Sequence, residues 1–592
     1  MALERDIPSK ENSPTSRSGE LGRHDSDRLA TLWQKLSRSR WSVALLMVAL
    51  LALRVVYTWH FRIDSDEPQH LHVVWGWANG LLPYRDVFDN HSPVFQALCA
   101  PLFHLLGERA DIVLCMRLAI LPCFIVTVWL VKKIVGSFAD RRTAIFSAWM
   151  AALFPPFFFS SIEFRPDQMW ATLWMATLAI LIYGRATPKR ALGAGLMLGL
   201  AFAVSMKTTL MLAALGAALV GTMLIVQDGA WTWARLRSLL ICVLAACAGI
   251  LVIPSLVVLF FISRGAGREM YYCVIQHNII PGNAGSHNLL SALLRLACLL
   301  PLVAIVGLVL RRQRMSAEIK RRISFSFLAA AFFYVFLVSF WPVLTAEDYL
   351  PFFPAMAVTV APLLLWICRF NVSRLGVTAA QTAAFLVLAE LAWLVGSNSP
   401  LNNQAADKVG MIADTLKLTS KTDYVMDAKG ETIYRRRAFY YVMERMALWR
   451  LHHGLVQDNV LQRLIETRAP LATTRRMPPE VKQFIHANYV PIAYRLWTLG
   501  QELPMSSART PQTVHFQVVI PARYVLMTPD GLVRGRLDGT PLNGARELAS
   551  GQHEFVRALG VHGQVILVWA NAWERGYSPF SEIKPDITTQ QD

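Results

Sequence analysis

The chain has 592 residues, of which 54% are hydrophobic, and it carries a net charge of +18. Its mean hydropathy of +0.38 and its apolar content lie well above those of an average globular domain, which excludes an ordinary soluble protein and favours a membrane protein. The basic excess does not indicate a nucleic-acid partner, because the Lys and Arg residues fall in short clusters between apolar runs and form no nucleic-acid-binding module.

The distribution of charge divides the chain into three parts. Residues 1–40 are polar and mixed in charge, residues 41–398 contain long uncharged stretches, and residues 399–592 are again rich in charge. The first part has neither the short apolar core nor the small-residue cleavage site of a signal peptide, so we predict a retained cytoplasmic tail. Residues 41–59 then serve as a signal anchor that enters the membrane lipids.

The middle part predicts a mostly α-helical, polytopic membrane domain. On the rule that a span needs roughly 20 apolar residues, about eleven stretches qualify. The fifth and sixth are separated only by Lys207, so they are either two short, tilted spans or one broken element. The predicted spans are residues 41–59, 112–131, 143–161, 168–184, 191–206, 208–226, 239–262, 289–310, 323–344, 350–368 and 375–397.

Lys and Arg residues orient these spans, because short cytoplasmic loops carry an excess of positive charge. With the amino terminus inside, the basic loops follow the second, fourth, sixth, eighth and tenth spans, and the opposite loops carry far fewer basic residues. An odd number of spans places the region after residue 398 outside. We therefore predict a multi-pass protein of the bacterial inner membrane, with its C-terminal region in the periplasm.

This orientation brings the ionisable residues at the outer ends of successive spans to one face of the membrane. Ionisable groups near membrane depth are costly and usually functional. For each single residue, the alternative is a solvated loop charge. The residues are Asp64, Asp66, Glu67, Glu163, Arg165, Asp167, Lys207, His277, Glu347, Asp348 and Tyr349.

The first outer loop, residues 60–111, is the longest in the membrane region. Residues 65–68 are of the types that begin a helix, and an apolar face over residues 71–78 predicts an amphipathic helix. Residues 94–106 predict a second helix that is too short to span. We expect both helices to lie in the membrane interface. Asp66, at the start of the first, would then meet a lipid head group; the alternative is that Asp66 only caps the helix.

These residues fit the transfer of a sugar from a polyprenyl phosphate. The anomeric carbon of such a donor already bears a phosphate leaving group, so the reaction needs a base for the acceptor hydroxyl and positive charge for the departing phosphate. Asp66 is the predicted base, and Lys207 and Arg165 pair with the phosphate. Glu163 or Asp167 orients the acceptor or these cations. Direct displacement would invert the anomeric configuration.

A divalent cation is the one cofactor that the sequence leaves open. Asp64 and Asp66 form a short DxD-like pattern whose hard carboxylate oxygens suit such an ion. A metal would matter most for a diphosphate donor, because a divalent cation would neutralise the additional negative charge. The metal therefore stays unassigned, with these two carboxylates as its ligands if there is one.

Five short motifs follow one another in the membrane region and carry a resemblance to a known family. They are Asp66-Glu67, then Leu82-Pro83-Tyr84-Arg85-Asp86 with His91-Ser92-Pro93, then Glu163-Phe164-Arg165-Pro166-Asp167, then Ser205-Met206-Lys207-Thr208, and Glu347-Asp348-Tyr349-Leu350-Pro351. In this order and with this topology, residues 41–400 resemble the GT-C glycosyltransferases. These integral membrane enzymes include the protein O-mannosyltransferases and the aminoarabinose transferase of lipid A.

The resemblance implies a GT-C fold and an inverting transfer of a hexose or pentose from a polyprenyl phosphate. The acceptor would be a lipid, such as lipid A, or a glycan or protein of the cell envelope. In the family's first-loop motif the Asp is the catalytic base, which corresponds to Asp66 with Glu67 beside it. Arg85 joins the predicted phosphate-binding residues.

The resemblance also adds three candidate site residues, with two departures from the family pattern. The candidates are His91, Asp348 and Tyr349. In the family, His or Arg is commoner than Asp before the tyrosine, which weakens a role for Asp348. Ser92 stands where the first of two prolines is common.

Residues 399–592 predict a soluble region, since they contain no long apolar stretch. We predict an α/β subdomain over residues 399–505 and a small β-rich module with a tail over residues 506–592. This region either recognises the acceptor or only covers the active face. Its predicted strands are residues 424–426, 470–473, 514–519, 524–527 and 565–569, and its predicted helices are residues 438–451 and 460–467.

Two other classes of function compete with a transferase. A secondary transporter should show repeated halves and discontinuous spans with polar groups near the bilayer midplane. The sequence shows no obvious repeat, and its ionisable residues lie at span ends. A scaffold that binds envelope glycans without chemistry would make Asp66 dispensable.

Overall fold

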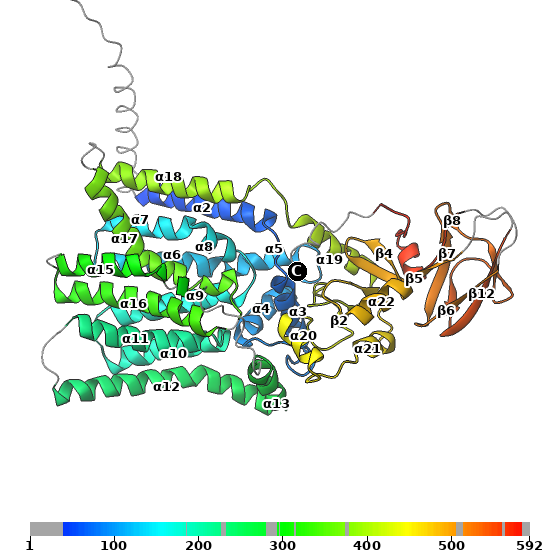
Figure 1. Ribbon diagram of the computed structural model, residues 1–592, viewed down its shortest axis with the longest axis horizontal. Helices are drawn as coiled ribbons and strands as arrows, with labels where there is room; N and C mark the ends of the chain where they lie inside the picture. The colour runs from blue at the N-terminus through cyan, green and yellow to red at the C-terminus, as the bar shows by residue number, and fades with distance from the viewer. Residues whose placement is uncertain are drawn as a thin grey trace, which may run out of the picture.

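The molecule is elongated, with a bundle of long helices at one end and a strand-rich region at the other (Figure 1). The computed structural model describes residues 40–582, with gaps at 185, 227–231, 280–289, 291–292, 295–296, 313–314, 342, 373–377, 505–512 and 559–562. The predicted cytoplasmic tail lies outside the described residues, except for Arg40.

A helix or a pair of consecutive helices lies over each of the predicted spans, side by side in the bundle (Figure 1). Within the described residues, 5 helices are long and apolar enough to cross a membrane, judged by length and composition. The mostly helical membrane fold is confirmed, whereas eleven crossings stay a prediction. The helices are α2 Arg40–His60, α5 Ile112–Arg117 with η1 Leu118–Ile120 and α6 Leu121–Val135, α7 Arg141–Leu153 with α8 Pro155–Ser160, α9 Pro166–Ile182, α10 Pro188–Val204, α11 Thr208–Ile225, α12 Trp233–Ser263, α15 Leu300–Arg312, α16 Ala317–Phe340, α17 Phe352–Val372 and α18 Ala379–Ser397.

The fifth and sixth predicted spans are two separate helices. α10 ends at Val204, the following Ser205 is extended with a φ of −151° and a ψ of 128°, and α11 begins after Lys207. α10 packs closely on α12 through glycines: a Cβ added to Gly199 would lie 2.5 Å from the Ile250 carbonyl oxygen. Close contact between backbones is a usual way for membrane helices to associate. This pairing fixes the end of α10, and with it the position of Lys207.

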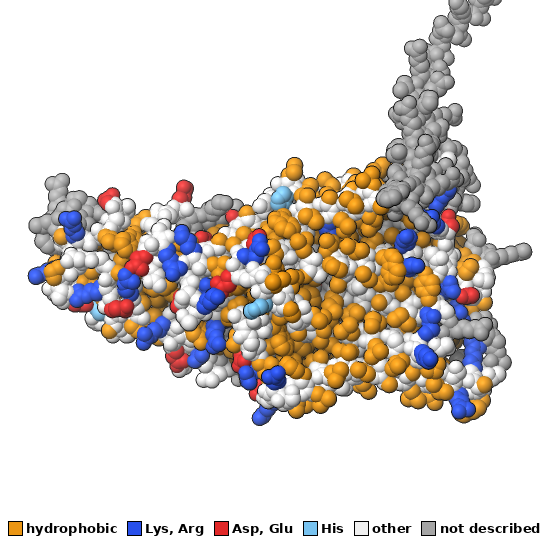
Figure 2. All heavy atoms as spheres, turned by 180° about the vertical axis from the view of Figure 1, so that it is seen from behind, with side chains coloured by type: hydrophobic (Ala, Val, Ile, Leu, Met, Phe, Trp, Pro, Cys, Tyr) orange, Lys and Arg blue, Asp and Glu red, His pale blue; other side chains and the backbone are white. Residues whose placement is uncertain are grey.

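The surface of the bundle agrees with a membrane protein. Figure 2 shows a broad apolar surface over the bundle, with Lys and Arg side chains gathered at the end far from the strand-rich region. Basic residues stand at the matching ends of α6 and α7, among them Lys132, Lys133 and Arg141. This distribution is the one on which the predicted orientation rests, and the orientation itself stays a prediction.

The first outer loop contains the two predicted helices, α3 Asp66–Ala78 and α4 Val94–Leu106. The expectation that both lie in the membrane interface is wrong for α3, which is buried from Glu67 to Gly76. The polar face of α3 is covered by the C-terminal region, where His72 Nδ1 lies 2.8 Å from the Ile433 carbonyl oxygen. α4 keeps an exposed apolar face. Short helices α13 Gly267–Tyr271, η2 Tyr272–Gln276 (a π-helix) and η3 Ala346–Tyr349 complete this end of the bundle.

The C-terminal region is built around a 9-stranded sheet in the order β11-β7-β13-β5-β3-β1-β2, with β4 and β8 at its sides, and a second sheet in the order β10-β9-β12-β6. β1 pairs in parallel with β2 and β3, and the other pairs are antiparallel. β5 pairs with β13 across the predicted boundary at residue 505. The strands are β1 Tyr424–Met426, β2 Arg436–Arg437, β3 Leu471–Ala472, β4 Tyr489–Ala493, β5 Leu496–Leu503, β6 Thr513–Val518, β7 Ala522–Thr528, β8 Gly531–Leu532, β9 Gly535–Leu537, β10 Thr540–Leu542, β11 Arg546–Leu548, β12 Gly551–Arg557 and β13 Val565–Trp569.

Helices in the C-terminal region match the predictions in part. The helix predicted over residues 460–467 is α21, whereas the one predicted over 438–451 begins only at Arg445. The preceding residues run along the bundle instead, where the Tyr440 hydroxyl donates to the Tyr84 carbonyl oxygen. Tertiary contacts here override local helix propensity. The helices are α19 Ala406–Leu418, α20 Arg445–His452, α21 Val460–Glu466, α22 Pro479–Asn488 and α23 Ala570–Glu574.

Candidate active site

Most of the predicted site residues meet where the helix bundle joins the C-terminal region. They come from four separate stretches: the start of α3, the turn before α9, the break between α10 and α11, and η3. We call this group the junction cluster. Its acidic members are Asp64, Asp66, Glu163, Asp167, Glu347 and Asp348, and its basic members are Arg62, Arg165, Lys207 and Lys429.

Arg165 lies at the centre of the junction cluster. Its backbone is extended at the start of α9, and Pro166 begins the helix, which points the guanidinium group back across the site. Nη1 lies 2.8 Å from Asp66 and 3.3 Å from Asp64, and Nε lies 3.2 Å from Asp167. The same Nη1 is 3.8 Å from Glu347. One buried cation therefore holds carboxylates from three segments in place.

Lys207 joins the second half of the cluster. Its Nζ lies 3.2 Å from Asp167 Oδ1 and also contacts Asp348 Oδ1. The rings of Trp170 and Trp341 flank the ammonium group, each with its centroid 5.8 Å away. Asp348 is itself fixed by a capping box, since its other oxygen accepts from the Thr345 backbone at 2.8 Å. Asp348 is therefore a direct member of the site.

Asp66 is the most open carboxylate among the ion pairs at Arg165 and Lys207. Its side chain is 27% exposed, and its two oxygens contact Arg165 and Lys429. Burial acts to raise the pKa of Asp66, but these two cations hold that pKa well below its usual value. The described bonds of the carboxylate go to side chains outside α3, and Ser65, at the N-cap position, makes no side-chain capping bond. Asp66 is thus ionised and faces the site.

Glu67 points away from Asp66 and has a full set of partners. It forms a two-bond ion pair with Arg117 at 2.6 and 2.7 Å, and neither side chain is exposed. Its oxygens also accept from the backbone N–H groups of Asp64 and Phe164 at 2.9 and 2.7 Å. Glu67 therefore ties the first outer loop to the segment that carries Arg165, and its carboxylate is not available to a substrate.

Glu163 is a buried member of the cluster with few partners. Its Oε1 lies 3.3 Å from Arg62 Nη2, and its Oε2 has no hydrogen-bond partner among the described residues. Burial, together with the nearby charges of Glu67, Asp64 and Glu347, raises the pKa of Glu163 well above its usual value. Burial and these charges therefore favour the protonated form of Glu163.

Other predicted residues lie around the cluster. His91 Nδ1 is 2.9 Å from Asp89, and the His91 ring lies 4.6 Å from that of His70, four residues after Asp66 on α3. Burial acts to lower the pKa of His91, but Asp89 raises it overall. Tyr349 packs its ring against Phe353, with centroids 6.2 Å apart.

Arg85 and His277 lie outside the junction cluster. Arg85 is 51% exposed and pairs with the adjacent Asp86 at 2.9 Å. His277 stacks on Tyr441 and lies 3.5 Å from Glu444 of the C-terminal region. The prediction that Arg85 binds the donor phosphate gains no support from this position.

Lys429 is the cluster residue that sequence reasoning missed. It lies in the loop between β1 and β2, 363 residues from its partner Asp66. A lysine just after a strand is ordinary in a soluble domain, so no local signal distinguished it. Arg117 was missed for a different reason, because it lies inside a predicted span.

Asp64 and Asp66 serve as ion-pair partners. Asp64 binds Arg62 and Arg165 at 3.1 and 3.3 Å, and one Asp64 oxygen accepts from the Asp66 backbone. In the part of the chain that the structure describes, no group of three or more His, Cys, Asp or Glu side chains is arranged to hold a metal ion. The DxD-like pattern therefore has no described set of further metal ligands.

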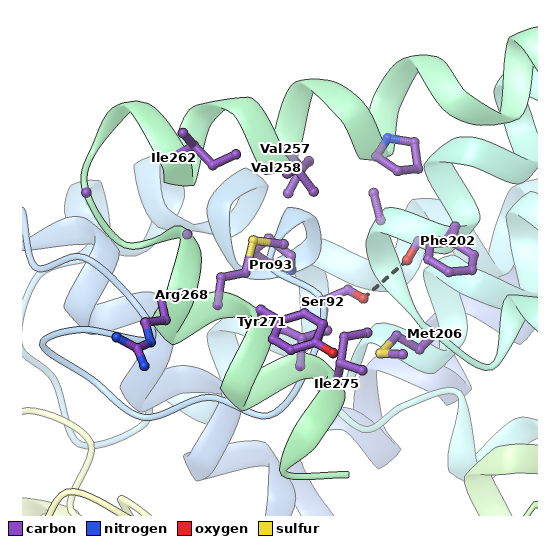
Figure 3. A pocket seen from close by; sticks show the side chains of 16 residues that line it. Ser92, Pro93, Phe202, Met206, Val257, Val258, Ile262, Arg268, Tyr271 and Ile275 are labelled. Atoms are coloured by element: carbon purple, nitrogen blue, oxygen red, sulfur yellow. Dashed lines mark hydrogen bonds between the residues drawn. The ribbon is translucent and has the colours of Figure 1, made fainter. Parts of the chain in front are cut away.

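An apolar cavity of about 540 Å³ lies at the same end of the bundle as the cluster. Figure 3 shows its walls, which come from α10, α12, α13 and the first outer loop, with Ser92 donating to the Phe202 carbonyl oxygen at 3.2 Å. Met206 and Ser92 line the cavity, and they are the chain neighbours of Lys207 and His91. The volume and the apolar lining are typical of a site for a hydrophobic ligand.

A comparison with known protein families matches part of the chain. A family model described as dolichyl-phosphate-mannose-protein mannosyltransferase matches residues 90–258. This stretch includes Arg165, Asp167 and Lys207 but not Asp66. No curated protein sequence matches the chain.

Solved structures of ArnT share the fold at low sequence identity. ArnT from Cupriavidus metallidurans bound to undecaprenyl phosphate has a TM-score of 0.54 and 14% identity, and the match covers 78% of this chain and 98% of that chain. The apo form of the same protein has a TM-score of 0.54 and 16% identity, over 78% and 97%. The oligosaccharyltransferase AglB from Archaeoglobus fulgidus has a TM-score of 0.40 and 11% identity, over 76% and 73%. The likeness to ArnT shows that this chain has the GT-C fold.

Proposed function

We propose that this chain, which has the fold of the GT-C glycosyltransferases, transfers a monosaccharide from a polyprenyl phosphate to a hydroxyl group of an envelope lipid, glycan or protein. One observation carries the proposal. The partly exposed carboxylate of Asp66 lies among buried cations, and an apolar cavity lined by Met206, the chain neighbour of Lys207, lies at the same end of the helix bundle. Together these features would supply a base, a phosphate site and a place for a lipid tail.

The donor's lipid tail would occupy the apolar cavity. A water-soluble nucleotide sugar has little apolar surface to bury against these walls. An isoprenoid chain that enters from the bilayer has such a surface and matches them. The family model that matches residues 90–258 names a dolichyl-phosphate sugar, and the similar ArnT structure holds undecaprenyl phosphate. Both relatives support a polyprenyl phosphate as the carrier.

The phosphate would lie near Lys207. Lys207 follows Met206, which lines the cavity, and carboxylates from two segments hold the ammonium group in position. Arg165 has the more structural role, because its donors are directed at four carboxylates. It orients Asp66, the proposed base, and Asp167, which contacts Lys207. Positive charge fixed where the phosphate departs lowers the barrier more than charge that must first move there.

The reaction is a single displacement. Asp66 accepts the proton of the acceptor hydroxyl as the acceptor oxygen bonds to the anomeric carbon of the donor. The bond between that carbon and the phosphate oxygen breaks, and the phosphate leaves with the electron pair. Attack from the face opposite the leaving group inverts the anomeric configuration. No covalent enzyme intermediate is needed.

The direct test compares Asp66→Asn with the wild-type chain, purified and supplied with undecaprenyl phosphate sugars and envelope acceptors. Loss of a general base typically lowers kcat by about 10² to 10⁴-fold. Release of undecaprenyl phosphate and mass analysis of the product measure the transfer. Binding of undecaprenyl phosphate should survive in the variant.

The control is Asp111→Asn, which also changes an arginine-paired carboxylate of the first outer loop but lies outside the junction cluster. We expect it to keep its turnover. Near-normal turnover by Asp66→Asn would remove Asp66 as the base. Sugar binding without transfer by the wild-type chain would favour a non-catalytic scaffold, and movement of intact substrate across the membrane would favour a transporter.

A further inference from the structure

The C-terminal region contributes a buried cation to the candidate site. Lys429 lies in the loop between β1 and β2, its side chain is only 6% exposed, and its Nζ contacts Asp66 Oδ1. The ammonium group is thus inserted between the two parts of the molecule and directed at the predicted base.

The loop around Lys429 is held firmly. The buried carboxylate of Asp427 accepts from the backbone N–H groups of Gly430 and Thr432 at 2.7 and 2.9 Å, and from Arg437 Nε at 3.0 Å. Gly430 has a φ of +77°, and a Cβ there would lie 2.7 Å from Cβ of His72 on α3. Only glycine permits both this conformation and this close contact. The fixed loop places Lys429 over the start of α3.

The three cations that contact Asp66 or Asp167 are tied down to different degrees. Arg165 faces four carboxylates, and Lys207 faces two carboxylates and two tryptophan rings. Among the described contacts, Lys429 has one carboxylate, that of Asp66. A lysine also carries its charge on a flexible four-carbon chain, whereas the arginine fork is fixed by its several bonds. Of the three cations, Lys429 therefore loses the fewest contacts when it changes partners.

We propose that Lys429 is a second ligand of the donor phosphate. In the donor-free protein the Lys429 ammonium group contacts Asp66, and it moves to the phosphate when the donor binds. This inference rests on the proposed function. The exchange frees one Asp66 oxygen for the acceptor hydroxyl and leaves the other on Arg165. It also makes the C-terminal region part of the active site.

The chemistry of the leaving group favours this exchange. The donor is a phosphodiester with one negative charge, and the departing phosphate monoester gains a second. An added cation therefore contributes more in the transition state than in the ground state, which is the condition for catalysis. The ionisable groups that act on Asp66 in the donor-free protein are Asp64, Arg165, Lys429, His70 and His91. Of Arg165 and Lys429, the two cations that contact Asp66 directly, departure of Lys429 leaves Asp66 a stronger base.

The test is a binding cycle on the full-length protein in lipid nanodiscs, with undecaprenyl phosphate as the probe. Lys429→Met should weaken binding about tenfold or more, as expected for loss of one charge-assisted hydrogen bond, and Lys429→Arg should keep most of the affinity. Asp66→Asn should bind at least as tightly as wild type, because the competing carboxylate is gone. In that background, Lys429→Met should still cost about tenfold or more.

The matched control is Lys408→Met. Lys408 is another lysine of the C-terminal region, and it docks on the first outer loop through the Ile63 carbonyl oxygen at 2.8 Å. It should leave the affinity unchanged. An equal loss in Lys408→Met would overturn the inference by assigning the effect to domain docking.

Three further outcomes also decide the question. If Lys429→Met has no effect once Asp66 is replaced, Lys429 acts only through Asp66 and the phosphate role is wrong. If wild type binds undecaprenyl phosphate and Lys429→Met binds it equally well, the inference alone is wrong. Failure of the wild type to bind would overturn the proposed donor together with it.

Discussion

Glu163 is a buried carboxyl group whose Oε2 atom has no hydrogen-bond partner. Its raised pKa means that the folded chain binds the proton more tightly than the unfolded chain does. The resulting contribution to stability is present at low pH and is lost as the pH rises through the folded-state pKa. In its protonated form Glu163 would act by packing and hydrogen bonding.

We therefore predict that Glu163→Gln keeps the fold and transfers sugar at nearly the wild-type rate, because glutamine has the shape and neutrality of the protonated acid. The variant should also lose the part of the decline in Tm at rising pH that Glu163 causes. Thermal unfolding of both proteins from acid to alkaline pH measures this difference. A large loss of transfer in the variant would show that an ionised Glu163 takes part in the reaction.

Most residues of the junction cluster could be predicted from the sequence, but the contacts that each of them makes could not. The motifs around Asp66, Arg165 and Lys207 could be found because each stands at the end of an apolar run. The partners of Glu67 could not, since Arg117 lies within such a run and pairs with it through folding alone. Lys429 is separated from Asp66 by 363 positions, and no local pattern encodes that contact.

At the scale of helices, the pairing of α10 with α12 forms the wall of the apolar cavity. Phe202 and Met206 come from the end of α10, and Pro254, Val257 and Val258 come from α12. The glycines one to three turns away hold the two backbones close together. The shape of the apolar cavity therefore depends on residues that do not line it.

A pair of alanine variants tests this dependence. Gly199→Ala places a Cβ 2.5 Å from the Ile250 carbonyl oxygen, so α12 must shift and the Tm and the affinity for undecaprenyl phosphate should both fall. Gly193→Ala, on the same helix, meets nothing within 4 Å. It should gain up to about 1 kcal/mol from helix propensity and bind normally. Equal behaviour of the two variants would contradict the role given to the close helix contact.

Helices and strands could be predicted from the sequence where the period and the length of the hydrophobic pattern determine them. The apolar runs predicted the bundle, and alternation predicted β6, whose residues are alternately exposed and buried. The helix expected from residue 438 begins at Arg445, because the preceding residues make contacts with the bundle that local propensity does not include. The sheet that joins β5 to β13 was likewise invisible, since strand order is set by packing between distant segments.

For the whole molecule, the central prediction is its orientation in the membrane. The basic ends of the bundle and the C-terminal region lie at opposite ends of the apolar surface (Figures 1 and 2). Ser316, between α15 and α16, and Ser420, after α19, are both exposed and lie at these two ends.

We predict that a membrane-impermeant thiol reagent added to intact spheroplasts labels Ser420→Cys but not Ser316→Cys. Both variants are compared with the unsubstituted chain, because it has exposed cysteines of its own. Lysis should make Ser316→Cys reactive as well. The reverse pattern would place the junction cluster on the cytoplasmic side and would contradict a transfer at the outer face.

The contact between Lys429 and Asp66 also bears on how the protein is made. Asp66 leaves the ribosome early, whereas Lys429 follows it by 363 residues and belongs to a sheet that is completed only by β13. Contacts between such distant segments form late in folding. A nascent chain therefore has an incomplete junction cluster until its C-terminal region has folded. Under the proposed function, the chain would gain activity only when its synthesis is nearly finished.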